Sequence, residues 1–404
     1  MTLDDARALD AADPLARFRD RFALPPGVIY LDGNSLGPLT HTSREAVADC
    51  VSRQWGERLI RSWNEGWIDA PARIGAKIAP LLGAQPHEVI AGDTTSANLF
   101  KALVAALRVD PARHVIVSEL GNFPTDLHIT EGAAACVPGA ELRAVPRAEL
   151  RQALGPDTAA LLLTHVHYKT AERFDMPAWT RVAHEAGTLA VWDLSHSVGA
   201  IPLALNEAGA DLAVGCTYKY LNGGPGSPAF LYVAERWQDR LESPLSGWMG
   251  HAEPFAFQDA YRPATGMKRW LVGTPPMLAM ASLEAALDLW TEVDMTELAV
   301  KSAALFDILA EAGDALGLEC VTPRDPAQRG SHISFKHPNA YALAQALIAR
   351  GVIGDFRDPD ILRLGLTPLY LSHEDVRRAA ELLGEVLAEE PWRDERFNKR
   401  MAVT

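Results

Sequence analysis

Short apolar runs alternate with helical stretches between Glu88 and Met280. The runs are EVIAG, HVIVSE, AALLLTHV, TLAVWD, DLAVGC and PAFLYV. Near-continuous apolar runs that are separated by helices are typical of a parallel sheet with both faces covered. PAFLYV follows DLAVGC too closely for a helical crossover, so we expect these two strands to be antiparallel.

The pattern changes at about residue 281. A long Ala- and Leu-rich helical stretch over 277–313 leads into the short strands LECVTP, GSHISFKH, VIGDFR and ILRLGL. Further helices are predicted over 339–350 and 373–389. This layout is α+β and indicates a second, smaller domain.

The first part of the chain is predicted to contain an amphipathic helix over 13–24 and helices over 41–62 and 71–83. Between them, VIYLDGNSLGPLT is a short strand that runs into a turn-rich loop. We therefore expect an α/β fold with three parts: an N-terminal segment, 1–62, that packs with the small domain; a large domain, 63–280; and a small C-terminal domain, 281–404.

Composition narrows the class of protein. The chain has 404 residues, of which 48% are hydrophobic and 22% charged, as in ordinary globular proteins. Its net charge of −14 argues against binding to nucleic acid or to an acidic membrane, since both need a basic face. Its start is acidic and lacks an apolar signal core, and no apolar run approaches the roughly 20 residues of a membrane span.

The cysteines are isolated and form no CxxC pair, so they suggest neither a disulfide framework nor a zinc site. They are Cys50, Cys136, Cys216 and Cys320. We expect a reducing, cytoplasmic location. The HVH triplet at 165–167 lacks a third ligand and is weak evidence for a metal, so no metal site is predicted.

Residues that could take part in catalysis or ligand binding follow the predicted strands. Ligands of open α/β sheets bind at these strand ends. Asp193 ends one strand, with His196 three residues later, and Lys219 follows the next strand. Pyridoxal phosphate (PLP) needs such a pair: a lysine amine that forms a Schiff base and a carboxylate that keeps the pyridine nitrogen protonated. Thr95 and Ser96 open a predicted helix that could hold the phosphate, and Phe123 could lie on the ring.

Each feature alone has an ordinary interpretation. Asp193 could be a turn or helix cap, His196 a structural hydrogen-bonding residue and Lys219 a solvated cation. The glycines of NGGPG follow the lysine, so this segment is a turn and not a P-loop. Among the other lysines, Lys169 and Lys268 lie in predicted loops and remain open, but neither follows a strand that ends in Asp. The ordered combination is what favours PLP.

Several motifs together resemble kynureninase, a PLP enzyme of fold type I in the aspartate aminotransferase superfamily. They are YLDGNSLGPL (30–39), WNEGWI (63–68), GNFPTD (121–126), LTHVHY (163–168), VWDLSHSVGAIP (191–202), CTYKYLNGGPGSPAF (216–230), GWMGH (247–251), GTPP (273–276) and RLGLTPLY (363–370). The resemblance spans nearly the whole chain. It implies the fold type I architecture, with a mostly parallel sheet between helices in the large domain and a smaller α+β domain.

The resemblance implies roles at matching positions. Lys219 would be the Schiff-base lysine and general base, Asp193 would pair with the pyridinium nitrogen, and Tyr218 would bind phosphate or handle a proton. The remaining cofactor contacts would come from Thr95, Ser96, Phe123, Pro124, Thr125, Asp126, Thr164 and His196. Trp248 and Thr274 would reach the cofactor of a second subunit in a homodimer. Arg363 would clamp the substrate α-carboxylate, and Trp63 and His251 would line the slot for its aromatic ring; either could instead be structural.

The implied reaction is hydrolysis of L-kynurenine to anthranilate and L-alanine, a step of tryptophan degradation. The nearest alternative is a cysteine desulfurase or selenocysteine lyase, which would need a mobile cysteine; the only candidate in the C-terminal half, Cys320, lies in a predicted strand. A PLP-binding regulator without activity is a second alternative, but the acidic N-terminus has no DNA-binding pattern. The sequence leaves open whether kynurenine or 3-hydroxykynurenine is preferred.

Overall fold

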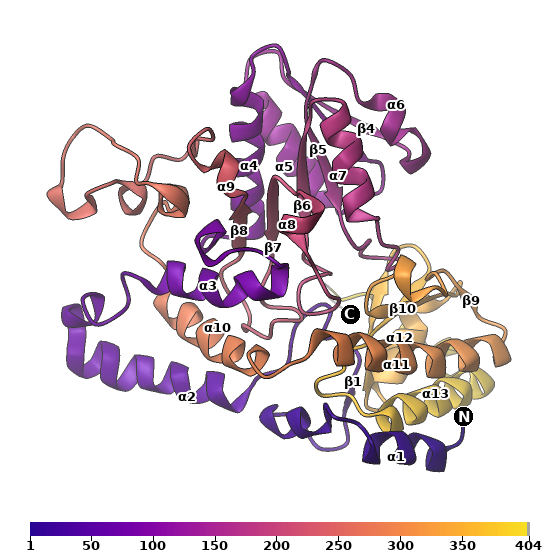
Figure 1. Ribbon diagram of the computed structural model, residues 1–404. Helices are drawn as coiled ribbons and strands as arrows, with labels where there is room; N and C mark the ends of the chain where they lie inside the picture. The colour runs from indigo at the N-terminus through magenta and orange to yellow at the C-terminus, as the bar shows by residue number, and fades with distance from the viewer. Residues whose placement is uncertain (402–404) are drawn as a thin grey trace.

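The structure is a computed structural model that describes residues 1–401 (Figure 1). Its α-helices are α1 (Leu3–Ala11), α2 (His41–Asp49), α3 (Ala70–Leu82), α4 (Thr95–Val109), α5 (Pro124–Ala135), α6 (Leu150–Ala153), α7 (Met176–Glu185), α8 (Leu205–Ala208), α9 (Glu235–Gln238), α10 (Met277–Trp290), α11 (Met295–Ala315), α12 (Ala340–Ile348) and α13 (His373–Glu389). Its strands are β1 (Ile29–Tyr30), β2 (Val89–Ala91), β3 (Val115–Glu119), β4 (Glu141–Val145), β5 (Thr158–Thr164), β6 (Leu189–Asp193), β7 (Leu212–Gly215), β8 (Phe230–Val233), β9 (Glu319–Cys320), β10 (His332–Lys336), β11 (Val352–Ile353), β12 (Asp355–Arg357) and β13 (Ile361–Gly365).

A seven-stranded sheet forms the centre of the larger part, in the order β2-β8-β7-β6-β5-β3-β4. The pairs from β7 to β4 are parallel, whereas β8 runs antiparallel to both β7 and β2. Both the mostly parallel sheet and the antiparallel last pair are therefore confirmed. Because β2 runs in the same direction as β7, the ends of β2, β5, β6 and β7 lie at one edge of the sheet.

Alternate residues of the strands face two different apolar clusters, as the pleat of a strand requires. On one face, Ile116, Leu162 and Val191 pack with α4 and α5. On the other face, Val117, Leu161 and Trp192 pack with a cluster that includes α3, α7 and α10. Burial on both faces explains why these strands read as continuous apolar runs.

The smaller part is built on an antiparallel sheet in the order β12-β13-β10-β9, with α11, α12 and α13 beside it (Figure 1). The N-terminal segment joins this part: β1 pairs in parallel with β11, and α1 packs on α13. After β1, the backbone N–H of Gly37 donates to the carbonyl oxygen of Tyr218 at 2.7 Å. The loop after β1 thus connects the small sheet with the Lys219 segment.

The structure differs from the sequence prediction at four places. The helix expected over 13–24 is a 3₁₀ turn, Ala16–Arg21, and the helix expected over 41–62 continues after α2 as a π-helix, Cys50–Arg58. The long helix expected over 277–313 is broken because Asp294 caps the start of α11. Strand β4 was not predicted, since it lies at the sheet edge and is only partly buried.

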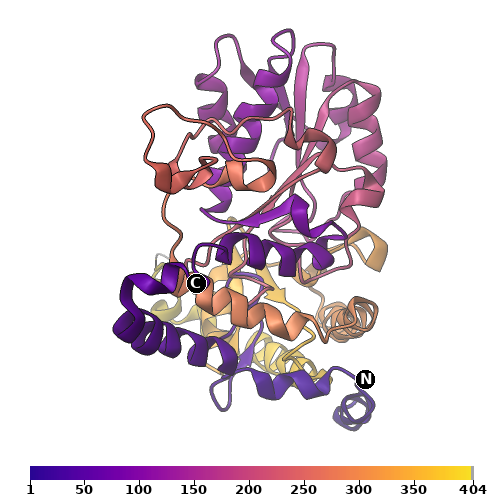
Figure 2. The same cartoon turned by 60° about the vertical axis from the view of Figure 1, so that its left-hand side comes forward.

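The segment between α9 and α10 leaves the large sheet and extends outward, to the left in Figure 1 and toward the viewer in Figure 2. It contains short 3₁₀ turns at Trp248–Gly250, Pro254–Ala256 and Gly266–Trp270. We call residues 241–273 the extended loop. Among residues 1–401, no helix is long and apolar enough to cross a membrane.

Candidate active site

The strand ends bring the predicted residues to one place. Thr164 ends β5 and Asp193 ends β6, and the two residues are direct neighbours in the parallel register. Lys219 follows β7, the next strand in the sheet. The order of these residues along the sheet therefore matches the order expected from the sequence.

The amine of Lys219 lies against an imidazole and two aromatic rings. Its Nζ is 3.0 Å from Nε2 of His196 and 5.9 Å from the ring centroids of both Phe123 and Tyr218. Burial, with the charges of Lys219 and Arg363, holds the pKa of His196 well below its usual value. A neutral His196 can accept a hydrogen bond from Lys219 at Nε2, which orients the amine.

Two carboxyl groups that interact electrostatically with this amine are buried together. Asp193 Oδ1 accepts hydrogen bonds from the backbone N–H of Ser195 at 2.8 Å and from its hydroxyl at 2.6 Å. Asp126, in the first turn of α5, lies 2.9 Å from the hydroxyl of Thr164. Burial raises the pKa of both aspartates, and the charge of Asp193 raises that of Asp126 further. A buried cation beside them would stabilise their charged form.

Helix α5 presents the aromatic residue of the site at its start. Phe123 is its N-cap residue, and Pro124 and Thr125 are its first two residues. The Phe123 ring is 40% exposed and meets Tyr168 edge-on, with the ring centroids 5.2 Å apart. Its backbone N–H donates to Asn122 Oδ1 at 2.6 Å, which fixes the turn into the helix. An apolar ring can therefore stack on an accessible face of Phe123.

Helix α4 begins at the same sheet edge with two hydroxyl groups. Thr94 is the N-cap, and its Oγ1 accepts from the backbone N–H of Ala97. Thr95 and Ser96 follow, and within residues 1–401 their hydroxyls have no hydrogen-bond partner. The first N–H groups of a helix also lack partners inside it, so this helix start suits a phosphate.

Arg363 lies on β13 and is almost fully buried, with 1% of its side chain exposed. Its Nε donates to Asp355 Oδ1 at 2.8 Å, and its Nη2 donates to Asp355 Oδ2 and to the Ser35 hydroxyl. Its Nη1 donates to the Tyr168 carbonyl oxygen. Arg363 is thus not the plain surface charge that a lone Arg on a strand could be.

Tyr218 lies next to Lys219 and is partly buried. Burial, together with the neighbouring Cys216, raises the pKa of its phenol. The hydroxyl therefore stays protonated at neutral pH and can donate a hydrogen bond or a proton.

Four of the predicted residues do not join this group within the described chain. Trp248 lies in the extended loop, 40% exposed, and packs edge-on against Phe255; Thr274 is exposed just after the loop. Both ring nitrogens of His251 form hydrogen bonds within the extended loop, and Nδ1 accepts from the backbone N–H of Glu253. Trp63 meets Trp67 edge-on.

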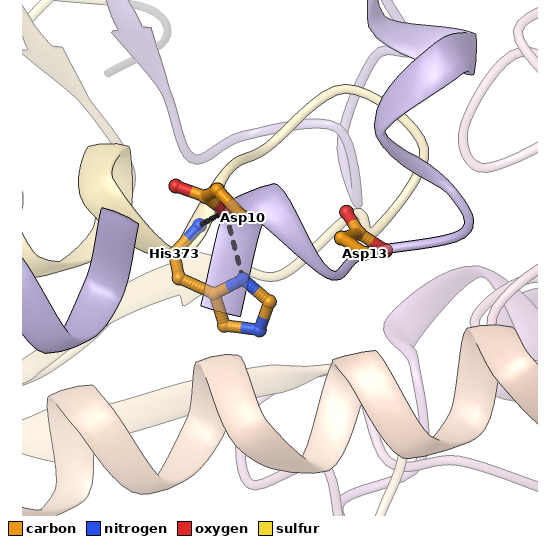
Figure 3. Close-up of side chains that lie close together, drawn as sticks. All are labelled: Asp10, Asp13 and His373. Carbon is orange, nitrogen blue, oxygen red and sulfur yellow. Dashed lines mark hydrogen bonds and ion pairs between the residues drawn. The ribbon is translucent and has the colours of Figure 1, made fainter. Parts of the chain in front are cut away.

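One group of potential metal ligands lies outside this site, among Asp10, Asp13 and His373 (Figure 3). Asp10 accepts hydrogen bonds from His373 Nδ1 and from the first N–H groups of α13, and so caps that helix. Asp13 forms an ion pair with the buried Lys301 at 2.6 Å. The ligand atoms are thus occupied by protein donors, and the group ties the N-terminal segment to α11 and α13.

The sequence did not single out Asn122, Ser195, Ser35 or Asp355, which support the predicted residues. Ser195 is two residues after Asp193, a spacing that is typical of an Asx-type turn and could have signalled it. Ser35 is distant in sequence from Arg363, and Asp355 meets Arg363 through the pairing of β12 with β13, so only the fold shows these contacts.

Comparisons with known proteins agree on the family. Residues 298–383 match the Kynureninase C-terminal domain family. The chain is 50% identical to the kynureninase of Pseudomonas fluorescens over 414 residues and 51% identical to that of Burkholderia mallei over 416 residues, with both chains fully covered in each case.

Solved structures show the fold. A cysteine desulfurase from Thermococcus onnurineus matches with a TM-score of 0.78 and 18% identity, covering 93% of this chain and 98% of its own. A C-DES mutant with glycine covalently linked to its PLP cofactor matches with a TM-score of 0.78 and 19% identity, covering 90% and 98%. The predicted fold type I architecture is confirmed, and the full-length relatives decide between families that share it: the chain belongs to the kynureninase family.

Proposed function

We propose that this protein hydrolyses L-kynurenine to anthranilate and L-alanine with PLP as its cofactor. The observation that carries the proposal is the position of Lys219 Nζ beside His196, Phe123 and the Asp193–Asp126 pair. The full-length similarity to kynureninases selects this reaction among those of the fold.

The residues present fit PLP. Asp193 and Asp126 are buried carboxyl groups with raised pKa values, which a pyridinium N–H would counter. Phe123 offers a ring face, and the hydroxyls of Thr95 and Ser96 stand at the start of α4. Lys219 would hold the cofactor covalently through Nζ.

Different residues of this chain would then transfer protons and stabilise charge. PLP, when bound, supplies an electron-accepting ring for the electron pair released at the substrate α-carbon. Lys219 Nζ, when it is not bonded to the cofactor, would take the α-proton as general base. His196 Nε2, at 3.0 Å, would orient it. Asp193 would keep its charge next to the ring nitrogen, and the protonated Tyr218 would donate toward the substrate carbonyl oxygen. Arg363 would orient the α-carboxylate, with Asp355 and Ser35 fixing its guanidinium.

We also propose a homodimer in which Trp248 and Thr274 reach the cofactor of the partner. Support comes from their exposure and from the extended loop, whose Phe255 and Phe257 are 56% and 78% exposed. Exposed aromatic side chains of this kind are typical of interfaces. An apolar groove of about 780 Å³, lined in part by Leu36, Leu39 and Leu278, offers a further surface for the same partner.

The domain limits 1–62, 63–280 and 281–404 and the cytoplasmic location remain proposals. The membership of the two main sheets supports the limits, because β2 to β8 lie in one sheet and β9, β10, β12 and β13 in the other. The free state of all four cysteines is compatible with a reducing compartment.

The cysteine considered for a desulfurase, Cys320, does not suit that role. The thiol of Cys320 ends β9, and burial raises its pKa, whereas a sulfur acceptor needs a mobile, readily ionised thiol.

The test uses Lys219→Ala, with Lys169→Ala as the matched control, because Lys169 is the other loop lysine near the site. Wild type and the control should absorb as PLP enzymes and release anthranilate and alanine from L-kynurenine; Lys219→Ala should do neither. Borohydride reduction and peptide mapping should locate the PLP adduct at residue 219. An adduct at another lysine, or full turnover by Lys219→Ala, would refute the proposal.

A further inference from the structure

A buried lysine lies behind the start of α4. Lys101 is on α4 with only 2% of its side chain exposed, and burial lowers its pKa. Its Nζ donates to Asp93 Oδ2 at 2.7 Å and to the carbonyl oxygen of Trp270 at 2.7 Å. Burying an ammonium group is unfavourable unless it is paired with an opposite charge. The ion pair with Asp93 therefore compensates the burial of Lys101.

Asp93 forms the turn between β2 and α4. Its φ is +52°, in the left-handed region that residues other than glycine seldom adopt. Its carbonyl oxygen accepts from the backbone N–H of Ala229 at 3.0 Å, and Lys101 holds its side chain. One residue later, Thr94 caps α4. The conformation of Asp93 therefore sets the direction in which the helix starts.

The charge of Asp93 matters for what this helix start can bind. The carboxylate is 30% exposed and belongs to a residue two positions before Thr95, which with Ser96 would hold the cofactor phosphate. Two like charges placed together oppose binding unless a cation compensates. Lys101 is the cation bonded to Asp93, and its contact with Trp270 also ties the loop before α4 to the end of the extended loop.

We propose that Lys101 is a positioning residue for the cofactor phosphate: it fixes the turn at Asp93 and neutralises the carboxylate that would otherwise repel the phosphate. Lys101 does not touch the phosphate in this account; it acts through Asp93. The inference rests on the proposed function, because it assumes that PLP binds at the start of α4.

The experiment compares two ligands that differ only in the phosphate. Apoprotein is titrated with PLP and with pyridoxal, and dissociation constants are measured by absorbance for wild type, Lys101→Met, Asp93→Asn and the double variant. Lys77→Met, which removes a lysine of similar helical setting on α3, serves as the control. Unfolding of each apoprotein is measured in parallel.

The expected pattern is selective for phosphate. Lys101→Met should weaken PLP binding about tenfold or more and leave pyridoxal binding nearly unchanged. The double variant should regain most of the PLP affinity, and Asp93→Asn alone should bind PLP at least as tightly as wild type. The last two variants test the idea even if Lys101→Met does not fold.

Two results would overturn the inference. One is an equal loss of PLP and pyridoxal affinity in Lys101→Met, which indicates a purely structural ion pair. The other is weaker PLP binding by Asp93→Asn than by wild type, or PLP binding by the double variant that is no tighter than by Lys101→Met. A wild-type apoprotein that takes up neither ligand would instead refute the proposed function.

Discussion

Arg363 and Asp355 form a two-point ion pair inside the small sheet, with Nε donating to Oδ1 at 2.8 Å and Nη2 donating to Oδ2. They face each other on neighbouring antiparallel strands, β13 and β12. Planar guanidinium and carboxylate groups match in this geometry, so the pair holds Arg363 in one orientation. In the proposed function, this pair would hold the buried arginine in place for the substrate α-carboxylate.

Replacement of Asp355 by Ala should destabilise the protein. Arg363 would keep a buried charge without its carboxylate, which costs about 3–5 kcal/mol in comparable pairs. Urea unfolding of the apoprotein checks this value. Asp358→Ala is the control: Asp358 pairs with Arg400, and both side chains are mostly exposed, so the change should stay within about 0.5 kcal/mol. An equally small change for Asp355→Ala would show that the pair adds no stability.

Arg363→Lys should raise the KM for L-kynurenine about tenfold or more, with a smaller effect on kcat. Lysine keeps the charge but lacks the planar, five-donor guanidinium that can bind Asp355 and a substrate carboxylate at the same time. Steady-state kinetics with L-kynurenine measure both constants. The exposed Arg378 on α13 is the control position, where Lys should change neither constant. An unchanged KM for Arg363→Lys would remove the proposed role in binding the α-carboxylate.

Asp32 should make stability depend on pH. Burial, followed by the charge of Asp355, raises the pKa of Asp32 from 3.8 to about 8. The folded protein thus binds a proton that the unfolded chain releases above pH 4, so the free energy of unfolding should fall as the pH rises from about 4 to 8.

The variant Asp32→Asn tests this effect, because the amide keeps the shape but cannot ionise. Its stability should fall less steeply than that of wild type over the same pH range. Thermal or urea unfolding at several pH values gives the slope, and the exposed Asp20→Asn is the control. Parallel pH curves for wild type and Asp32→Asn would contradict the assignment.

Subunit mixing tests whether two subunits share their active sites, as proposed. Lys219→Ala and Trp248→Ala homodimers should each be nearly inactive. After the two variants are mixed and reassembled at random, about half of the dimers are heterodimers, and each heterodimer has one intact site and one inactive site. Activity should therefore return to about a quarter of that of wild type. No recovery, with heterodimers present by mass spectrometry, would show that Trp248 serves its own subunit.

The sequence predicted which residues gather at the candidate site because a simple physical rule connects the apolar pattern with position in the sheet. Continuous apolar runs predict parallel strands buried on both faces, and the ends of parallel strands meet at one edge. Thr164, Asp193 and Lys219 follow such runs, and the structure places them together. The strand-to-helix turn before Thr95 could be predicted in the same way.

The supporting contacts could not be predicted, because they depend on how distant segments pack. Ser35 lies in the loop after β1, 328 residues from Arg363, and Asp355 meets Arg363 through the pairing of β12 with β13. Similarly, β4 has no continuous apolar run, since an edge strand is only partly buried. The break between α10 and α11 depends on a single capping residue, Asp294.

The pairing of β1 with β11 has a consequence for biosynthesis. During translation, the loop after β1 emerges early, but its partner strand and Arg363 emerge near the end of the chain. The ribosome must therefore nearly finish before the Arg363 side of the candidate site can form. Nascent chains that stop short would expose an incomplete centre, and a cell would gain no activity from a truncated product.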